Sequence, residues 1–316
     1  MEMKSAKYFS ISLLLSLMIF TGINVLSVKS EDLFFNYISQ NQQVFGASVG
    51  SIFDNIKTAR GAVNLEIGAK AAGSALISPN GEVVLLFKKN ISDTFPIASI
   101  TKLMAADIAV KNLDLSEIVK IQSTTGNKIN QFSGESFTIG NLLSAGLVES
   151  NNDFFYSISK SIGTDAFVEL MNLQAKSLGM SNTFFANPTG LDPADDGDPI
   201  NYSSVTDLTK LAYHLTKEPL ILQMTAQREF DLYSIDGKLQ QTAATTNELL
   251  NSDFSFGGKM ILGGKTGETK KAGQTLILIF KDFKTNGYLV NVILGSEDRF
   301  ADMMKMINWV FSAYEI

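Results

Sequence analysis

The sequence predicts an α+β fold, in which one antiparallel sheet is flanked by helices and a mainly helical second lobe lies beside it. Apolar runs of β type occur at residues 74–87 and 274–294, and the stretch between them has a mostly helical pattern. Strands from both ends of a domain can complete one sheet that helices then cover. With 316 residues, 45% of them hydrophobic, the chain can bury a full core. We expect a cleft between the two lobes.

Composition excludes several classes of site. The chain has no cysteine and a single histidine, His214, so it lacks a disulfide framework and thiolate ligands, and a zinc site is not expected. Lys and Arg number 26 against 32 Asp and Glu, without a basic stripe, so nucleic acid is not an expected partner. His214 lies in a helical pattern and is expected to be a core or surface histidine. No metal and no cofactor is predicted.

The N-terminal segment, residues 1–28, is predicted to lie outside the folded domain. Lys4 and Lys7 precede an uncharged apolar run, residues 9–28. Twenty helical residues reach roughly 30 Å, the thickness of the hydrocarbon core of a bilayer. The run is predicted to be an uncleaved membrane anchor or a cleaved signal, and its length favours the anchor. Residues 29–66 would then be a juxtamembrane spacer and residues 67–316 the folded domain, on the extracytoplasmic side of the membrane.

The first elements of the domain are a hairpin and a helix. Residues 74–78 and 82–87 flank Pro79-Asn80-Gly81, a strong hairpin signal. Pro96 precedes the helix-forming run 100–110, which places Ser99 at or near a helix N-terminus.

Helical patterns and a second hairpin follow. Residues 139–179 and 201–222 have helical patterns. Residues 274–280 and 288–294 are β-type runs joined by 281–287, and residues 302–314 predict a closing helix.

Three short motifs carry the chemistry, in this order: Ser99-Ile100-Thr101-Lys102, Ser150-Asn151-Asn152 and Lys265-Thr266-Gly267. Serine and lysine three residues apart on a helix share a face, so the amine can reach the hydroxyl. A helix N-terminus also favours a developing oxyanion. With one histidine and no cysteine, lysine is the economical means of activating a serine. The second Ser-x-x-Lys, at 157–160, lies inside a helical run where backbone N–H groups are already paired.

Each motif alone has an ordinary structural explanation. Ser150-Asn151-Asn152 could be a polar helix cap, and Gly263-Gly264-Lys265-Thr266-Gly267 could be a glycine-rich turn that leads to the strand starting at Gln274. Their conjunction in this order matches the motif set of penicillin-binding proteins and β-lactamases, with Asn151 where that set has Asp.

The neighbouring residues also resemble one family, the D-alanyl-D-alanine carboxypeptidases of the S11 peptidases, which are low-molecular-mass penicillin-binding proteins. The resemblance covers residues 67–316 and lies in the following segments: Pro96 to Met104, Glu149 to Asp153, Phe185 to Leu191, Thr246 to Leu250, Asp298 to Phe300 and Trp309 to Phe311. It implies a fold of the β-lactamase/penicillin-binding-protein type and a serine-type carboxypeptidase domain. Peptidoglycan stem peptides would be the substrate, and β-lactam antibiotics would be covalent inhibitors.

The resemblance also implies a role for each site residue. Ser99 would attack the D-Ala-D-Ala carbonyl, and Lys102 would be the general base, with a pKa lowered by burial and by Lys265. Ser150 would relay a proton, and Asn152 would contact the peptide carbonyl of the substrate. The terminal carboxylate would be bound by Lys265, Thr266 and Gly267, with Arg299 nearby. The backbone N–H groups of Ser99 and Glu268 would form the oxyanion hole.

Two departures and several alternatives remain open. The family commonly has an aromatic residue or histidine where this chain has Glu268, whose charge should weaken binding of a substrate carboxylate unless it points away. The sequence ends at Ile316 without the family's frequent β-rich domain and amphipathic helix, so the N-terminal segment would be the only anchor.

A D,D-endopeptidase or transpeptidase would share this site. A class A β-lactamase would need a glutamate such as Glu169, which lies in a helical run, and an inactive wall-binding module is a further alternative.

Overall fold

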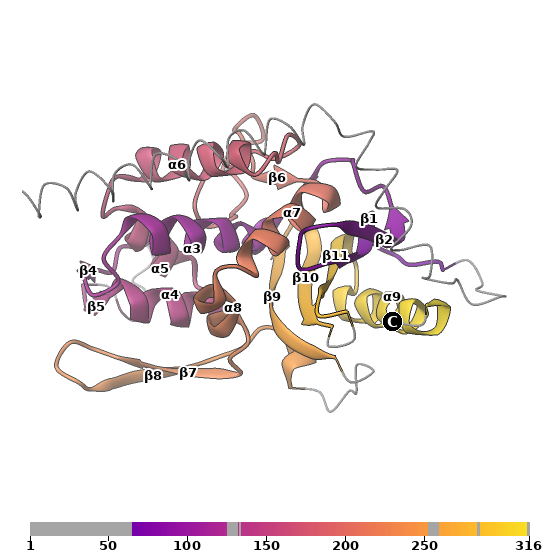
Figure 1. Cartoon of the computed structure of the whole chain (residues 1–316). Coiled ribbons are helices and arrows are strands. Elements are labelled where there is room, and N and C mark those ends of the chain that lie inside the picture. Colours follow the sequence, from indigo (N-terminus) through magenta and orange to yellow (C-terminus); the bar gives the residue numbers. More distant parts are fainter. Residues whose placement is uncertain (1–64, 125–131, 133, 252–258, 283–284, 315–316) are drawn as a thin grey trace, which may run out of the picture. The chain divides into compact units, whose positions relative to one another are not determined.

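A five-stranded antiparallel sheet is assembled from both ends of the described chain, as the sequence predicts (Figure 1). Its strand order is β2-β1-β11-β10-β9. The strands are β1 (Ala71–Ile77), β2 (Val83–Lys89), β9 (Met260–Thr269), β10 (Gly273–Lys281) and β11 (Tyr288–Ser296). The N-terminal strand β1 pairs with the C-terminal strand β11, with Ala71 opposite Leu294. The predicted α+β class is therefore confirmed.

The computed structural model describes residues 65–124, 132, 134–251, 259–282 and 285–314. The predicted membrane segment and nearly all of the predicted spacer lie outside these residues. Among the described residues, no helix combines the length and the apolar character that crossing a bilayer requires. The anchor and the domain boundaries therefore stay predictions.

Both predicted hairpins are present. Ser78 donates its backbone N–H to Glu82 O (2.9 Å) and accepts one from Gly81 (3.0 Å), which closes the turn between β1 and β2. Gly81 has φ +92°, a left-handed conformation that glycine adopts without strain. β10 and β11 pair from Lys281 opposite Tyr288 onward.

The sequence did not predict β9 as a strand of its own. A glycine-rich turn was the structural alternative that the sequence allowed around Lys265-Thr266-Gly267, whereas these residues lie within a ten-residue edge strand. The glycines are needed because other backbone segments approach closely. A Cβ on Gly264 would lie 2.4 Å from Ile277 O, and one on Gly263 would lie 2.9 Å from Leu222 O. Residues that usually mark a turn therefore serve close packing here.

Helices cover both faces of the sheet. Alternate strand residues Ile277, Ile279, Val290 and Val292 belong to the main apolar core together with residues of α7 (Val205–Leu215). The residues between them, such as Leu276 and Leu278, are also fully buried. They point to the opposite face, where α9 (Arg299–Ala313) packs against β10 and β11. The predicted closing helix is present and begins at Arg299, after the N-cap Asp298.

The helical part of the chain surrounds α3 (Thr101–Asn112), which follows the short 3₁₀ turn η1 (Ala98–Ile100). Helices α4, α5, α6 and α8 all contact α3. Their bounds are α4 (Ile139–Val148), α5 (Asn152–Ser159), α6 (Thr164–Ser177) and α8 (Pro219–Thr225). Nine consecutive residues of α3 are buried, including two charged ones, Lys102 and Asp107. A helix buried on all sides can hold an ionisable group away from water.

The predicted helical stretch 201–222 is divided into three parts. Tyr202–Ser203 forms the short strand β6, which pairs with β3 (Phe95–Pro96), and then α7 and α8 follow. Pro219 begins α8, because proline lacks the N–H that would continue α7 but fits the first turn of a new helix.

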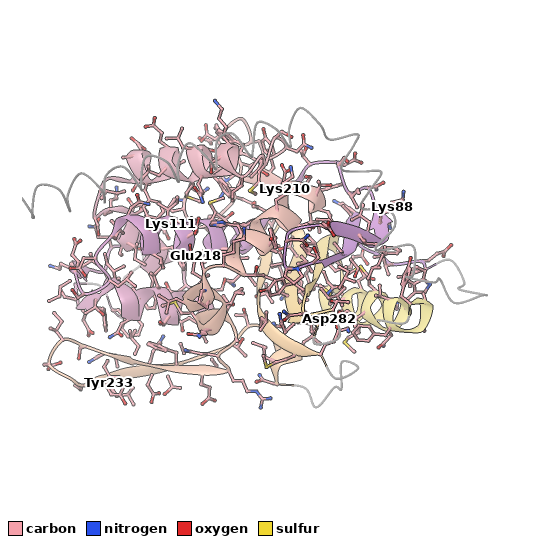
Figure 2. The ribbon with its side chains drawn as sticks, viewed as in Figure 1. Lys88, Lys111, Lys210, Glu218, Tyr233 and Asp282 are labelled. Carbon is pink, nitrogen blue, oxygen red and sulfur yellow. The ribbon has the colours of Figure 1, made fainter. Side chains whose placement is uncertain are left out.

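Two further strand pairs and a 3₁₀ turn were not predicted. They are β4 (Ile118–Lys120) with β5 (Ser136–Thr138), β7 (Glu229–Tyr233) with β8 (Leu239–Ala244), and η2 (Glu248–Leu250). Tyr233, at the turn end of the β7–β8 hairpin, is 44% exposed and is labelled in Figure 2. These strands carry no motif residue.

Candidate active site

Ser99 lies in the turn that leads into α3. It is the middle residue of η1, and Lys102 is the second residue of α3. The preceding residue, Ala98, has φ +48°, an uncommon conformation for a residue with a side chain. Gly190 (φ +87°) packs directly on it, because a Cβ on Gly190 would lie 1.9 Å from Ala98 O. The loop that contains Gly190 therefore fixes the backbone on which Ser99 sits.

The amine of Lys102 is fully buried and has three oxygen neighbours. Its Nζ lies 2.7 Å from Ser99 Oγ, 2.6 Å from Asn152 Oδ1 and 2.7 Å from Thr189 O. The two carbonyl oxygens can only accept hydrogen bonds, whereas the hydroxyl can also donate. A neutral amine has two N–H donors for the carbonyls, which leaves its lone pair for the Ser99 hydroxyl. The geometry thus suits an uncharged lysine that accepts a proton from serine.

Electrostatics favour the same state of Lys102. Burial lowers its pKa well below the ordinary value, and the positive charge of Lys265 lowers it further. Both effects disfavour the cationic form and therefore favour an amine that can take up a proton.

The second motif turns sharply before α5. Ser150 has φ +65°, so its backbone is left-handed. The side chain of Asn151 then caps α5 by accepting hydrogen bonds from the N–H groups of Asp153 (3.0 Å) and Phe154 (3.3 Å). Asn152 is the first residue of α5, and its amide oxygen reaches Lys102. The cap that the sequence allowed as a structural explanation is therefore present, and it also orients the flanking Ser150 and Asn152.

The third motif brings a second buried lysine to Ser150. Lys265 Nζ donates to Ser150 Oγ (2.9 Å) and to Thr266 O (3.0 Å). Burial lowers the pKa of Lys265 to about 7, with a further contribution from the positive charge of Arg299. The site therefore contains two Ser–Lys pairs, and the charge of Lys265 disfavours a positive charge on Lys102.

Gly267 brings the edge strand close to the nucleophile segment. A Cβ at this position would lie 2.8 Å from Ser99 N and 2.6 Å from Thr275 Oγ1. A side chain would therefore push β9 away from η1. This proximity places the backbone of β9 beside the N–H of Ser99, as a two-donor oxyanion site requires.

Arg299 and Glu268 lie at the end of the motif strand. Arg299 Nη1 donates to Gly267 O (2.9 Å) and lies 3.3 Å from Glu268 Oε2. The Arg299 side chain is 14% exposed, whereas that of Glu268 is 57% exposed. The carboxylate of Glu268 is thus paired with Arg299 and largely in contact with solvent.

The second Ser-x-x-Lys sequence has a structural role. Ser157 is buried in α5, where its hydroxyl donates to Asp153 O (2.7 Å) and accepts from the N–H of Gln122 (2.8 Å). Lys160 is exposed and stacks over Tyr156. Geometry thus distinguishes the two Ser-x-x-Lys sequences.

His214 lies in a polar cluster between α3 and α7. Its Nε2 lies 3.0 Å from Asp107 Oδ1 and 2.8 Å from Lys111 Nζ. Donor atoms of Asp107, His214 and Glu218 lie within 4.8 Å of one another, which is compatible with a metal site (Lys111 and Glu218 are labelled in Figure 2). The ammonium of Lys111 already supplies positive charge to Asp107. The cluster is therefore best described as an ion-pair network.

Sequence reasoning did not identify two groups at the site. The first is the carbonyl of Thr189, an acceptor for Lys102, and the second is the hydroxyl of Thr246, which hydrogen-bonds that of Thr266. Both lie in segments with family resemblance, 185–191 and 246–250, and this was the available signal. A backbone carbonyl has no side-chain signature of its own.

This arrangement can perform acyl transfer, because a hydroxyl nucleophile lies beside an amine whose cationic form is disfavoured, and a second lysine lies beyond them. A serine–lysine acyltransferase or hydrolase is the class that these residues define. The roles of individual residues stay predictions.

Comparison with known proteins assigns the family. The family model of the peptidase S11 group, D-alanyl-D-alanine carboxypeptidase, matches residues 60–298. The chain belongs to this family of peptidases. It is similar to a D-alanyl-D-alanine endopeptidase of Pseudomonas aeruginosa, with 31% identity over 252 residues that cover 76% of this chain and 77% of the relative.

A second relative and a solved structure agree. The D-alanyl-D-alanine carboxypeptidase DacF of Bacillus subtilis is 31% identical over 261 residues, which are 78% of this chain and 64% of that protein. The structure of penicillin-binding protein D2 from Listeria monocytogenes in its ampicillin-bound form has 27% identity and a TM-score of 0.67. The superposition covers 79% of this chain and 99% of the Listeria chain. The predicted resemblance to this family and its fold is confirmed.

Proposed function

We propose that the protein is a serine-type D-Ala-D-Ala carboxypeptidase that trims peptidoglycan stem peptides through an acyl-enzyme on Ser99. The observation that carries this proposal is the environment of Lys102, whose amine lies between the Ser99 hydroxyl and two carbonyl acceptors. Its lowered pKa leaves a lone pair available for the serine proton. The family match supports the substrate class.

Acylation begins with proton transfer from Ser99 to Lys102. The serine oxygen attacks the carbonyl carbon of the penultimate D-Ala, and the carbonyl electrons move to oxygen. The backbone N–H groups of Ser99 and Glu268 stabilise this oxyanion. The C–N bond then breaks, and the leaving amine takes up the proton that Lys102 accepted from Ser99, relayed through Ser150, which lies 2.9 Å from Lys265. Lys102 is thereby neutral again. Free D-Ala departs, and the peptide remains as an ester of Ser99.

Substrate binding relies on attraction between the negative terminal carboxylate of the peptide and the basic side chains of the site. Lys265 and Thr266 bind the terminal carboxylate, with Arg299 adding positive charge nearby. Asn152 donates its amide N–H to the peptide carbonyl while its oxygen stays on Lys102. Gly267 lets β9 approach the Ser99 segment closely, so that the substrate would contact both segments.

Hydrolysis completes the cycle. A water molecule loses a proton to Lys102 and attacks the ester carbonyl. The ester C–O bond breaks, the proton returns to Ser99, and the shortened peptide is released. No cofactor takes part in these steps.

β-Lactam antibiotics would acylate the same serine, because their strained amide presents a carbonyl and a carboxylate in one molecule. Support comes from the related Listeria protein, whose structure is described as ampicillin-bound. We place the domain on the extracytoplasmic side of a bacterial membrane, held there by the predicted N-terminal segment, since peptidoglycan lies outside the cytoplasm.

A D,D-endopeptidase is the second candidate, since the Pseudomonas relative carries that name. It would use the same acyl-enzyme with a cross-linked peptide as donor. A transpeptidase would differ only in passing the acyl group to an amine. An inactive wall-binding module would retain no turnover.

The test is release of D-Ala from an acetylated L-Lys-D-Ala-D-Ala peptide by the full-length chain. Wild type should release D-Ala, and Ser99→Ala and Lys102→Met should not. Lys160→Met, in the second Ser-x-x-Lys sequence, is the matched control and should behave as wild type. No release from this peptide, together with cleavage of cross-linked dimers, would replace the carboxypeptidase with the endopeptidase. If the protein cleaves neither the peptide nor the cross-linked dimers, the inactive wall-binding module is the remaining interpretation.

A further inference from the structure

Glu268 and Thr266 lie on the same side of β9. Residues two apart on a strand point to the same face, separated by roughly 7 Å along the strand. In the proposed function, Thr266 binds the terminal carboxylate of the substrate. The backbone positions of the exposed Glu268 and of Thr266 are thus separated by less than the distance over which charges interact at physiological ionic strength, about 8 Å.

Glu268 also engages the cation that would assist carboxylate binding. Its Oε2 lies 3.3 Å from Nη1 of Arg299, which is held in place by a hydrogen bond to Gly267 O. The Arg299 guanidinium stacks on Phe300, and its backbone N–H donates to Gln274. Arg299 is thus a fixed positive charge, and Glu268 compensates it. A substrate carboxylate must compete with Glu268 for this charge.

We propose that Glu268 is a specificity-determining residue that weakens selection for a free terminal carboxylate. Its direct repulsion and its pairing with Arg299 act in the same direction, because both make the binding region less positive. Substrates whose leaving amino acid carries a carboxamide or a further peptide bond avoid this repulsion. The substrate class then includes amidated or chain-continued peptides beside those with a free terminal D-Ala. This inference rests on the proposed function.

The experiment measures kcat/KM at pH 7 for two peptides, acetylated L-Lys-D-Ala-D-Ala and its C-terminal carboxamide. The quantity compared is the ratio of acid to amide. Glu268→Gln removes the charge and keeps the shape and the exposed position of the side chain. Glu297→Gln is the matched control, because Glu297 is an exposed carboxylate two residues before Arg299.

We expect Glu268→Gln to raise the acid-to-amide ratio about tenfold, which corresponds to about 1.4 kcal/mol. Glu297→Gln should change the ratio less than about twofold. The rate of acylation by benzylpenicillin, which carries a carboxylate, should rise in Glu268→Gln in parallel with the ratio.

Two results would overturn the inference while leaving the proposed function intact. In the first, the wild type cleaves the acid peptide, but Glu268→Gln leaves the acid-to-amide ratio of kcat/KM unchanged. The other is an equal loss of activity toward both peptides in that variant, which would assign Glu268 a purely structural role. Wild type that cleaves neither peptide and binds no penicillin would instead refute the proposed function, and the inference with it.

Discussion

The side-chain nitrogen of Lys102 lies 2.7 Å from the hydroxyl oxygen of Ser99, on the first turn of a helix that is buried on all sides. The helix thus excludes water from the amine and holds it against the nucleophile at once. The burial that lowers the pKa of Lys102 is produced by the same packing that fixes its position. Several consequences of this arrangement can be measured.

Replacing Lys102 with methionine should slow acylation by benzylpenicillin about 1,000-fold. The side chain keeps a similar length, so folding should persist, but Ser99 loses its proton acceptor. General base catalysis typically contributes about 10² to 10⁴ in rate. Stopped-flow acylation kinetics, with circular dichroism to verify folding, would check this. A variant that is folded and acylates within tenfold of wild type would exclude Lys102 as the base.

The activity toward D-Ala-D-Ala peptides should fall as pH rises above about 7. Lys265 must be protonated to attract the substrate carboxylate, and its pKa is lowered to about 7 by burial and by Arg299. Removing the Arg299 charge favours the protonated form, so Arg299→Gln should move this falling limb to higher pH. The apparent pKa belongs to the coupled lysines together. Profiles of kcat/KM against pH would show the shift.

Lys305→Gln, an exposed charge on the same helix, is the control for that profile. It should leave the limb unmoved. A limb that stays in place in Arg299→Gln, or moves to lower pH, contradicts the assignment to Lys265.

Asp107→Asn should lower the free energy of unfolding by about 2 kcal/mol at pH 7. The Asp107 side chain is fully buried and bonds Lys111, His214 and Gln174. Losing the charge weakens these charge-assisted bonds. Urea unfolding would measure the change, with the exposed Asp195→Asn as control.

The Asp107 contribution should also depend on pH. Burial acts to raise its pKa, but hydrogen bonds and charges from His214 and Lys111 outweigh this and lower it. A carboxyl with a lowered pKa stabilises the fold above its unfolded pKa of about 3.9 and loses that contribution as pH falls through its folded pKa. The wild type should therefore lose its advantage over Asp107→Asn below about pH 4. An advantage that grows on acidification would contradict this sign.

Gly190→Ala should reduce acylation at least about 100-fold. Its φ of +87° disfavours a side chain, and a Cβ would lie 1.9 Å from Ala98 O. Relief of this clash must displace either η1 or the loop that carries the Thr189 carbonyl. Gly197→Ala, where a Cβ meets nothing within 4 Å, should be neutral. Thermal unfolding and acylation rates of both variants would show whether the loop matters in this way.

The sequence predicts those parts of the fold whose signals are local. The turn Pro79-Asn80-Gly81 specifies the β1–β2 hairpin within a few residues, and Pro96 followed by a helix-forming run specifies the start of α3. The strand β9 was not predicted because Gly263 and Gly264 weaken the strand pattern. Glycine is needed at these two positions because Leu222, in α8, and Ile277, in the neighbouring strand, approach the backbone closely. Such contacts have no local signature.

The candidate site follows the same division. The three motifs name the side chains that the structure brings together, since residue type and order carry that information. The left-handed backbone of Ser150, the carbonyl of Thr189 and the pairing of Glu268 with Arg299 depend on tertiary contacts. They could be found only once the chain segments were placed side by side.

The most direct test of the central claim is the intact mass of the full-length chain after exposure to benzylpenicillin. Wild type should gain the mass of one penicillin molecule, and a folded Ser99→Ala variant should gain none. An unmodified wild type, or an adduct that persists in Ser99→Ala, would contradict the assignment of Ser99 as the acylated nucleophile.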